Sequence, residues 1–246
     1  MNVGITGSRG FIGSHIADFL KSEKNIKLSF FDLPQNNLLK DDQNLKRFVK
    51  NNDVIIHTAV VNRGNNADVV EGGIIATYNL ISAIKKYSNK TKLIFFSSIQ
   101  AEMDTVYGLG KKLTEIILED ISKRFKIHVS IFRLTHVFGE GSKPFNTSAV
   151  ATFCYQTANN KKITVYPESK NRKINLIYVE DLIKLVSKET FQKRKNPFYF
   201  KKISTGNEIM VKDLAKLIWS FRKIEEKKLK NRFQKNLYKT YLSYGK

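Results

Sequence analysis

Apolar residues recur along the first half of the chain in two alternating patterns. Short, nearly continuous apolar runs cover residues 2–6, 26–31, 53–59, 92–98 and 128–133. Runs of this length are typical of strands that are buried on both faces. Helical spacing follows the first run, at Phe11, Ile12, Ile16, Phe19 and Leu20. Further helices are predicted over about 68–87 and 107–124.

This alternation predicts an α/β fold with a Rossmann-like, doubly wound parallel sheet. After the segment 138–141 the pattern changes to loops, short strands and short helices. We therefore expect a Rossmann domain over residues 1–140 and a small C-terminal substrate-binding lobe over residues 141–246. The lobe should belong to the same compact unit, return some elements to the sheet and lie over its carboxyl edge.

The C-terminal tail carries three tyrosines at a three-residue spacing, Tyr238, Tyr241 and Tyr244. On a helix this spacing puts them on one face. An exposed stripe of three tyrosines would be an interaction patch. We expect the tail to fold back on its own lobe.

The chain of 246 residues has a net charge of +21, from 43 basic and 22 acidic residues. The basic residues thicken toward the C-terminus but are not interleaved with aromatic residues at a stacking spacing. This favours a solvated basic surface over a nucleic-acid site. No apolar run is long enough to insert into a membrane, and no signal peptide precedes the first strand. The one cysteine, Cys154, is predicted to be a core residue, no metal site is expected, and a cytoplasmic location follows.

A glycine-rich turn, Gly7-x-x-Gly10-x-x-Gly13, lies between the first strand and the first helix. Gly7 would make the tight turn, Gly10 would let the backbone approach a pyrophosphate, and Gly13 would let helix and strand pack closely. The helix then offers the free N–H groups of its first residues, Phe11 and Ile12, to the phosphates. The arrangement predicts a dinucleotide cofactor.

Two charged residues point to different forms of that cofactor. Asp32 ends the second strand, where an acid reads the ribose diol of NAD(H). Arg9, between the glycines, could instead hold the 2′-phosphate of NADP(H). We expect both NADP(H) and NAD(H) to be used. Ala59 ends the third strand at the cofactor edge, and His57 is predicted to be a packed strand-end histidine.

Tyr107 and Lys111 are four residues apart, which puts both on one face of a helix. A fixed ammonium should lower the phenol pKa toward neutrality, so that the pair could move a proton to or from a carbonyl oxygen. Ser98 ends the preceding strand, and its hydroxyl could polarise that carbonyl.

The glycine turn, Ser98 and the Tyr107–Lys111 pair together resemble the extended short-chain dehydrogenases/reductases, the NAD-dependent epimerase/dehydratase family. The likeness covers nearly the whole chain. Segments 61–63, 97–101, 143–146, 150–155 and 237–244 further resemble the reductase half of the capsular-polysaccharide enzymes of the UDP-N-acetyl-L-fucosamine pathway.

That resemblance implies NAD(P)H-dependent reduction of the C4 ketone of a UDP-2-acetamido-2,6-dideoxy-hexulose, with Tyr107 as proton donor. It implies a homodimer formed through the two long helices of the sheet. In the resembling enzymes a C-terminal cupin domain epimerises the substrate, and this chain ends where that domain would begin. A separate epimerase partner is one expectation, and a substrate that needs no epimerisation is the other. The implied substrate contacts are Arg63, Gln100, His136, Lys143 and Asn146.

The sequence departs from the family pattern at several positions. Gly73 replaces an asparagine, and Gly110 replaces a small polar residue. Ile174 replaces a substrate-binding arginine, for which Arg172 or Arg63 could stand in. Ile99 and Gln100 replace the acidic pair of the dehydratases. A nucleotide-sugar 4-epimerase is the nearest alternative. A non-catalytic cofactor sensor and a nucleic-acid-binding protein are alternatives of other classes.

Overall fold

The computed structural model describes residues 1–40, 42–61, 64–146, 148–204 and 207–245. The chain divides into two compact units. The first unit comprises Met1–Leu134 and Ile183–Ile203, and the second comprises Thr135–Leu182 and Ser204–Lys246. The first unit thus includes a segment from the part of the chain that the sequence assigned to the lobe.

The first unit is built on a six-stranded sheet in the order β2-β1-β3-β4-β5-β8. All neighbouring strands in it are parallel. The strands are β1 (Asn2–Thr6), β2 (Lys27–Phe31), β3 (Val54–His57), β4 (Lys92–Ser98), β5 (Val129–Leu134) and β8 (Phe198–Lys202). The predicted Rossmann-like parallel sheet is confirmed. Strand β8 was not predicted.

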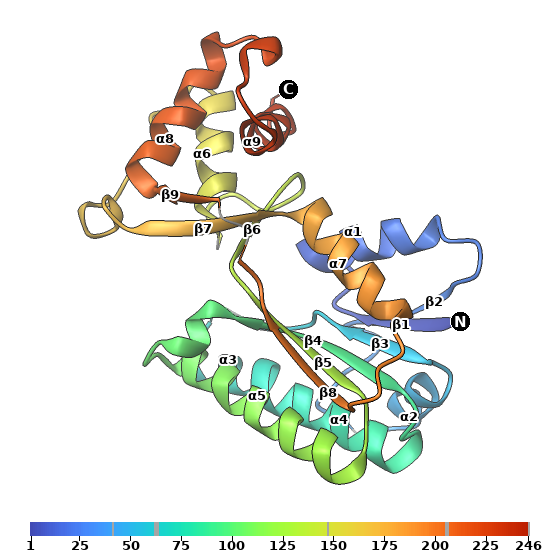
Figure 1. Cartoon of the computed structure of the whole chain (residues 1–246). Coiled ribbons are helices and arrows are strands. Elements are labelled where there is room, and N and C mark those ends of the chain that lie inside the picture. The colour runs from blue at the N-terminus through green and yellow to red at the C-terminus, as the bar shows by residue number, and fades with distance from the viewer. Residues whose placement is uncertain (41, 62–63, 147, 205–206, 246) are drawn as a thin grey trace. The chain divides into compact units, whose positions relative to one another are not determined.

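Helices cover both faces of this sheet (Figure 1). On one face lie α2 (Gln43–Lys50), α4 (Ala76–Tyr87) and α5 (Val106–Phe125). Their apolar residues form one core with β3, β4 and β5, including the fully buried Leu45, Leu80 and Leu118. Helix α1 (Phe11–Lys21) lies on the other face, and α7 (Val179–Phe191) begins in the second unit and ends in the first.

The predicted helix over 68–87 consists of three segments. A short α3 (Asn66–Val69) leads into a π-helical stretch, Val70–Ile75, and then into α4. A Cβ atom on Gly72 would lie 2.3 Å from the side chain of Val61. The chain passes so close to residue 61 that only glycine fits, and two consecutive glycines weaken a regular helix. Such π-helical stretches often occur at functional sites.

The second unit contains a small sheet and three packed helices. Strands β6 (His136–Phe138) and β7 (Lys173–Tyr178) are parallel, and β9 (Glu208–Met210) pairs antiparallel to β7. The helices are α6 (Ala149–Ala158), α8 (Val211–Ser220) and α9 (Arg232–Leu242), which pack together on this sheet (Figure 1). Short 3-10 turns occur at Ile99–Glu102, Pro167–Ser169, Phe221–Lys223 and Glu226–Lys228.

The C-terminal tail packs within the second unit, as the sequence predicted. The rings of Tyr238 and Tyr241 lie 5.3 and 5.9 Å from that of Phe221. The Tyr244 ring lies edge-on to Tyr155, at 6.4 Å. Leu237 of the same helix is fully buried.

Within the described ranges, no helix is both long and apolar enough to cross a bilayer.

Candidate active site

The glycine-rich turn brings β1, the end of β3 and the start of α1 into close contact. Gly7 has a φ of +75°, and a Cβ atom there would lie 2.6 Å from the Ala59 nitrogen. A Cβ atom on Gly13 would lie 2.1 Å from the Gly7 carbonyl oxygen. Both approaches exclude any side chain, so the predicted tight turn and close helix packing have a direct steric cause.

Gly10 is different, because a Cβ atom there would meet only the Gly7 oxygen, at 3.2 Å. Gly10 is also the N-cap of α1, and no side chain caps the helix. The N–H groups of Phe11 and Ile12 precede the first helical hydrogen bond, from Ser14 N to Gly10 O. An open, uncapped helix N-terminus behind a glycine turn fits a pyrophosphate. These residues therefore suit a dinucleotide cofactor.

Asp32 lies beside this turn, just after β2. Its carboxylate accepts hydrogen bonds from the backbone N–H groups of Gly7 and Ser8 and from the Ser8 hydroxyl. Arg9 is exposed, and its guanidinium donates to the Leu33 carbonyl oxygen at 3.4 Å. The two residues that indicate different cofactor forms therefore lie at the same strand end.

The start of α5 is held against the end of β4. Thr105 caps α5 by accepting the Gly108 N–H at 3.0 Å. A Cβ atom on Gly108 would lie 2.3 Å from the Gln100 carbonyl oxygen, so the helix start packs directly on the turn Ile99–Glu102. Ser98 accepts the Gln100 N–H at 3.1 Å and also hydrogen-bonds the Tyr107 side chain. The structure thus brings Ser98, Gln100 and Tyr107 together.

The expected lowering of the Tyr107 pKa by Lys111 is wrong. Burial raises the pKa of Tyr107, and only the Ser98 hydrogen bond opposes the increase. The Lys111 ammonium lies 5.9 Å from the centre of the Tyr107 ring and donates instead to the Phe96 carbonyl oxygen at 2.8 Å. Tyr107 therefore stays a neutral phenol, the form that can give up a proton.

Lys111 is itself buried, with 6% of its surface exposed. Burial lowers its pKa to about 7, although the Glu115 carboxylate opposes this change. Its ammonium lies 4.6 Å from the centre of the Phe95 ring. Glu115 follows Lys111 by four residues on α5, so the helical spacing could have identified this partner.

His57 is fully buried beside this site. Its Nδ1 lies 2.6 Å from the Thr6 hydroxyl oxygen, and its Nε2 lies 3.0 Å from that of Thr77. Burial, and secondarily the charge of Lys111, lowers the pKa of His57 to about 3. His57 is therefore a neutral, hydrogen-bonded packing residue, as the sequence suggested. Nothing in the sequence singled out its partner Thr77.

Arg133 belongs to an ion-pair network in the first unit, in which Arg133 and Glu115 are buried and Glu102 and Lys202 are exposed. Its Nε donates to Glu115 at 2.9 Å, its Nη2 also contacts Glu115, and its Nη1 donates to Glu102 at 2.8 Å. Lys202 of β8 donates to the same Glu102 at 2.7 Å. Glu102, the acidic residue nearest to Ser98 along the chain, is therefore occupied by two cations.

The other predicted substrate contacts lie mostly in the second unit. His136 begins β6 and is half-buried, and its pKa is lowered by burial and by the charge of Arg172. Lys143 and Asn146 are exposed in the segment that follows β6. Arg63 lies outside the described residues.

Ile174 is buried in β7, where it pairs with Ile209 of β9. It therefore packs in the small sheet. Arg172 lies two residues earlier, is exposed, and is close enough to His136 to affect its pKa. Of the two arginines considered as replacements, Arg172 is the one whose position the structure describes.

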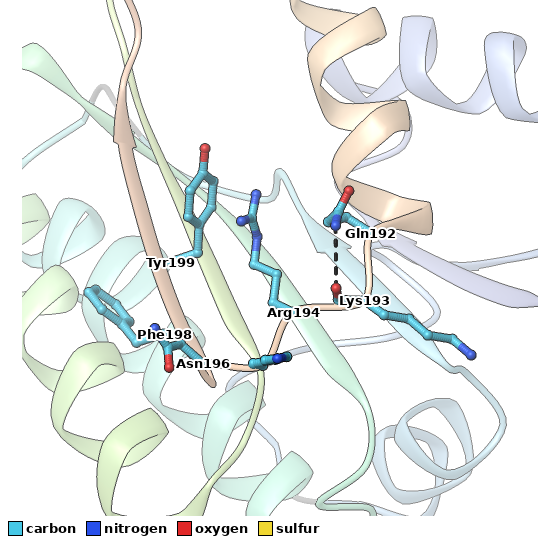
Figure 2. Close-up of a pocket in the computed structure, with 7 residues that line it drawn as sticks. Gln192, Lys193, Arg194, Asn196, Phe198 and Tyr199 are labelled. Carbon is cyan, nitrogen blue, oxygen red and sulfur yellow. Dashed lines mark hydrogen bonds between the residues drawn. The ribbon is translucent and has the colours of Figure 1, made fainter.

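A cavity of about 300 Å³ also occurs in the first unit, lined by seven residues of the segment 192–199 (Figure 2). It adjoins Phe198, which pairs with Val129 at the start of β5, whereas Ser98 pairs with Leu134 at its end. Figure 2 shows Arg194 beside Tyr199 and Lys193 directed away from both. Arg194 is paired with the buried Glu189 at 2.6 Å. This cavity is therefore separate from the predicted site.

Over the described part of the chain, no three His, Cys, Asp or Glu residues are grouped as metal ligands would be.

Comparison with known proteins agrees with this geometry. Residues 3–189 match the model of the NAD dependent epimerase/dehydratase family. The chain is 30% identical over 249 aligned positions to a UDP-2-acetamido-2,6-beta-L-arabino-hexul-4-ose reductase of Pseudomonas aeruginosa. That alignment covers 99% of this chain and 65% of the reductase. The family resemblance inferred from the sequence is confirmed.

Solved structures show the same fold. The capsular polysaccharide assembling protein CapF of Staphylococcus aureus superposes with a TM-score of 0.81 at 27% identity, over 100% of this chain and 66% of that protein. The UDP-glucose 4-epimerase of Thermotoga maritima, solved with UDP-glucose, has a TM-score of 0.84 at 19% identity, over 99% and 98% of the two chains. This chain thus spans about two thirds of the length of the reductase and of CapF.

Proposed function

The chain belongs to the NAD dependent epimerase/dehydratase family, and we propose that it is a nucleotide-sugar reductase. The proposed reaction is the NAD(P)H-dependent reduction of the C4 ketone of a UDP-2-acetamido-2,6-dideoxy-hexulose, for capsule or surface polysaccharide synthesis. The observation that carries the proposal is the arrangement of Tyr107, hydrogen-bonded to Ser98 and one helical turn before the buried Lys111. The 30% identity to the Pseudomonas reductase supports the choice of substrate.

Each residue of this group has a defined task. A nicotinamide cofactor, when bound, supplies the hydride. The Ser98 hydroxyl holds the ketone oxygen by a hydrogen bond, and Tyr107 gives its proton to that oxygen. The raised pKa of Tyr107 keeps this proton in place until the oxygen becomes basic. Lys111 is assigned to the nicotinamide ribose. Gly7, Gly10, Gly13, Ala59 and the first residues of α1 are assigned to the rest of the cofactor.

The residues around Ser98 argue against a 4,6-dehydratase. Ile99 and Gln100 have no ionisable side chain for the acid and base steps of that reaction. Glu102 is the next acid along the chain, and the adjacent Lys202 and Arg133 hold its pKa below the ordinary value. A carboxylate fixed in two ion pairs is a poor proton donor.

The nucleotide end of the substrate is assigned to the second unit. Lys143 and Asn146 are exposed there, and Arg172 adds an exposed guanidinium near His136. Cations of this kind suit a diphosphate, for which arginine has the better geometry. Gln100 is assigned to the sugar, because its backbone contacts Ser98.

We propose a homodimer formed through α4 and α5. Exposed apolar side chains gather on these two helices, at Tyr78, Leu109, Leu113 and Ile116, with 46–55% of their surface accessible. Helix faces of this kind are commonly covered by a partner. A cytoplasmic location, where nucleotide sugars are made, completes the proposal. A separate epimerase partner stays a prediction.

Incubation of the chain with NADPH or NADH and the 4-keto sugar nucleotide tests the proposal. A reductase consumes one reduced cofactor for each ketone, with loss of the nicotinamide absorbance. A 4-epimerase instead interconverts sugar nucleotides with no net cofactor consumption. Interconversion without consumption would favour the epimerase and overturn the reductase assignment.

Tyr107→Phe provides the matched test of the mechanism. The ring remains and only the proton donor is lost, so cofactor affinity should stay within about twofold while turnover falls by ~10²–10⁴-fold or more. Cofactor titration and steady-state kinetics measure the two effects. Near-wild-type turnover in this variant would show that Tyr107 is not the proton donor.

A further inference from the structure

The segment 139–146 has three residues in the left-handed half of backbone space. It follows β6, and its residues belong to no helix or strand; α6 begins later, at Ala149. Gly139, Gly141 and Phe145 have φ values of +154°, +79° and +58°. For Phe145 this left-handed conformation costs about 1–2 kcal/mol. A segment of this kind keeps one conformation only when its neighbours hold it.

A charged cluster holds the first part of the segment. The Lys239 ammonium of α9 lies 3.2 Å from the Glu140 carboxylate, 2.8 Å from that of Glu180 and 3.0 Å from the Tyr178 hydroxyl oxygen. The Tyr178 hydroxyl is in turn 2.9 Å from the Glu140 carboxylate. Hydrogen bonds to Glu180 and Tyr178 raise the pKa of Lys239, which stays charged.

The Lys239 and Glu180 side chains of this cluster are solvent-exposed, at 58% and 50% accessible, whereas Tyr178 is buried. Ion pairs of this kind contribute little to folding stability, typically about 0–1 kcal/mol. Their effect is to fix the place of Glu140, because the Lys239 ammonium of α9 and the Tyr178 hydroxyl of β7 both contact its carboxylate.

The end of the tail holds the rest of the segment. The Tyr244 hydroxyl donates to the backbone carbonyl oxygen of Ser142, a buried residue. The Tyr244 ring contacts Tyr155 of α6, and the Tyr155 ring lies edge-on to Phe145 at 5.5 Å. The Phe145 N–H is satisfied by the Thr152 hydroxyl at 3.0 Å.

These anchors lie next to the two exposed polar residues of the segment. Ser142 directly precedes Lys143, and Phe145 directly precedes Asn146. We propose that α9 and the residues that follow it position the segment 139–146 for nucleotide-sugar binding, with Lys239 and Tyr244 as positioning residues that touch neither substrate nor cofactor. The inference rests on the proposed function, because that function assigns Lys143 and Asn146 to the nucleotide.

Two variants of the full chain test this role, each with a control residue on α9. Lys239→Met removes the ammonium from the cluster, and Lys235→Met removes an exposed ammonium one turn earlier. Tyr244→Phe removes the hydroxyl that holds Ser142. Tyr238→Phe removes a hydroxyl from a ring that packs on Phe221. Lys239→Arg keeps the charge and should restore most of the wild-type behaviour.

Two measurements are made on every variant. Hydrogen–deuterium exchange of the peptide that covers residues 139–146 reports whether the segment is held. Calorimetric titration with UDP and with the nicotinamide cofactor measures whether the position of the segment affects the affinity for either ligand. We expect faster exchange and an about five- to tenfold weaker UDP affinity in Lys239→Met and Tyr244→Phe, the effect of losing about one hydrogen bond. The cofactor affinity of these two variants should stay within twofold of wild type. In both control variants the affinities for UDP and for the cofactor should do the same.

Unchanged exchange of the segment in both variants would overturn the inference. So would faster exchange with unchanged UDP affinity, because the tail would then hold a segment without a role in binding. A failure of the proposed function is distinguished at the start: the wild-type chain itself would not bind UDP. In that case the proposed role of α9 in nucleotide binding would be wrong as well, whatever the exchange data show.

Discussion

At the scale of single residues, the buried Lys111 carries a large electrostatic penalty. Its ammonium is buried, donates to the Phe96 carbonyl oxygen and lies over the Phe95 ring, and the Glu115 carboxylate offsets only part of the effect of burial. Removing a charge from water costs free energy that such contacts do not fully restore. The proposed function gives a reason for this cost, because it assigns the ammonium to the nicotinamide ribose.

This penalty predicts a pH-dependent stability difference for Lys111→Met. The pKa is about 7 in the folded chain, against an ordinary value of 10.5. The unfolded state therefore binds the proton more tightly, and wild-type stability rises with pH across this window. Methionine carries no such penalty. The variant should be more stable than wild type near pH ~6, on the order of 5 kcal/mol at ~1.4 kcal/mol for each unit between the two pKa values, and the gap should fall to about 1 kcal/mol or less by pH ~10.

Urea unfolding at the two pH values measures this difference. Lys112→Met is the control, since Lys112 is the next residue and is exposed. Its removal should change stability by less than about 0.5 kcal/mol at either pH. A Lys111→Met variant that is no more stable than wild type at low pH would show that the buried ammonium is better compensated than its contacts indicate.

The sequence predicted which residues meet at this site but not their electrostatics. The positions of Ser98, Tyr107 and Lys111 follow from a strand end and a helical spacing, both of which are local. The pKa of Tyr107 moved opposite to the expectation, because burial depends on which elements cover the ring. Neither the burial of Lys111 nor its bond to Phe96 is visible in a spacing of four residues.

At the scale of elements, two glycines in the turn between β1 and α1 have different roles. Gly13 is required by the protein itself, since its Cβ atom would overlap the Gly7 carbonyl. Gly10 faces a space in which a Cβ atom would meet only one protein atom, at 3.2 Å. Glycine is therefore required for packing at position 13, whereas at position 10 the proposed reason is the approach of a ligand. Substituting each glycine by alanine can distinguish the two roles.

Gly13→Ala should reduce stability by about 1–3 kcal/mol, as overpacking does, because backbone atoms cannot yield at 2.1 Å. Gly10→Ala should fold with a stability within about 0.5 kcal/mol of wild type but bind the cofactor at least tenfold more weakly. Thermal melts and cofactor titration give the two values for each variant. Unchanged cofactor affinity in Gly10→Ala would show that the pyrophosphate does not bind at this turn.

The end of β2 gives a second prediction, on the cofactor form. Arg9→Ala should weaken NADPH about tenfold, the effect of losing a charged hydrogen bond, and leave NADH nearly unchanged. Lys27→Ala, at the opposite end of the same strand, should change neither. The ratio of kcat/KM for the two cofactors is the measurement. A wild-type preference above about a thousandfold, some 4 kcal/mol, would contradict the use of both forms.

Elements were predictable where their pattern is local. The strands of the first five positions in the sheet were located from apolar runs, within one or two residues at most ends. The π-helical stretch was not, and the close approach of Gly72 to Val61 within it is a contact that no local pattern reveals. Strand β8 was missed since Phe198–Lys202 ends in two lysines, which an edge strand tolerates and an apolar pattern does not reveal.

At the scale of the whole molecule, neither compact unit is a single continuous stretch of the chain. Residues 183–203 belong to the first unit although residues 135–182 precede them in the second. The chain re-enters the first unit through the pairing of β8 with β5. A pairing between strands so far apart in the sequence is not specified by any local pattern. The tail was predictable because its tyrosine spacing and its buried face are features of one helix.

The packing of α9 gives the last prediction, a comparison of two leucines on one helix. Leu237 is fully buried, whereas 53% of the Leu242 surface is exposed. Leu237→Ala leaves a cavity and should reduce stability by about 2–5 kcal/mol, while Leu242→Ala should cost less than about 0.5 kcal/mol.

The single tryptophan, Trp219, lies on α8 of the second unit. Its fluorescence in urea therefore reports the unit that contains α9, and far-UV circular dichroism reports the whole chain. The fluorescence midpoint should fall in Leu237→Ala and stay in place in Leu242→Ala. Equal midpoints for the two variants would show that α9 is not packed on its own unit, and its tyrosines would then be available as a surface for a partner.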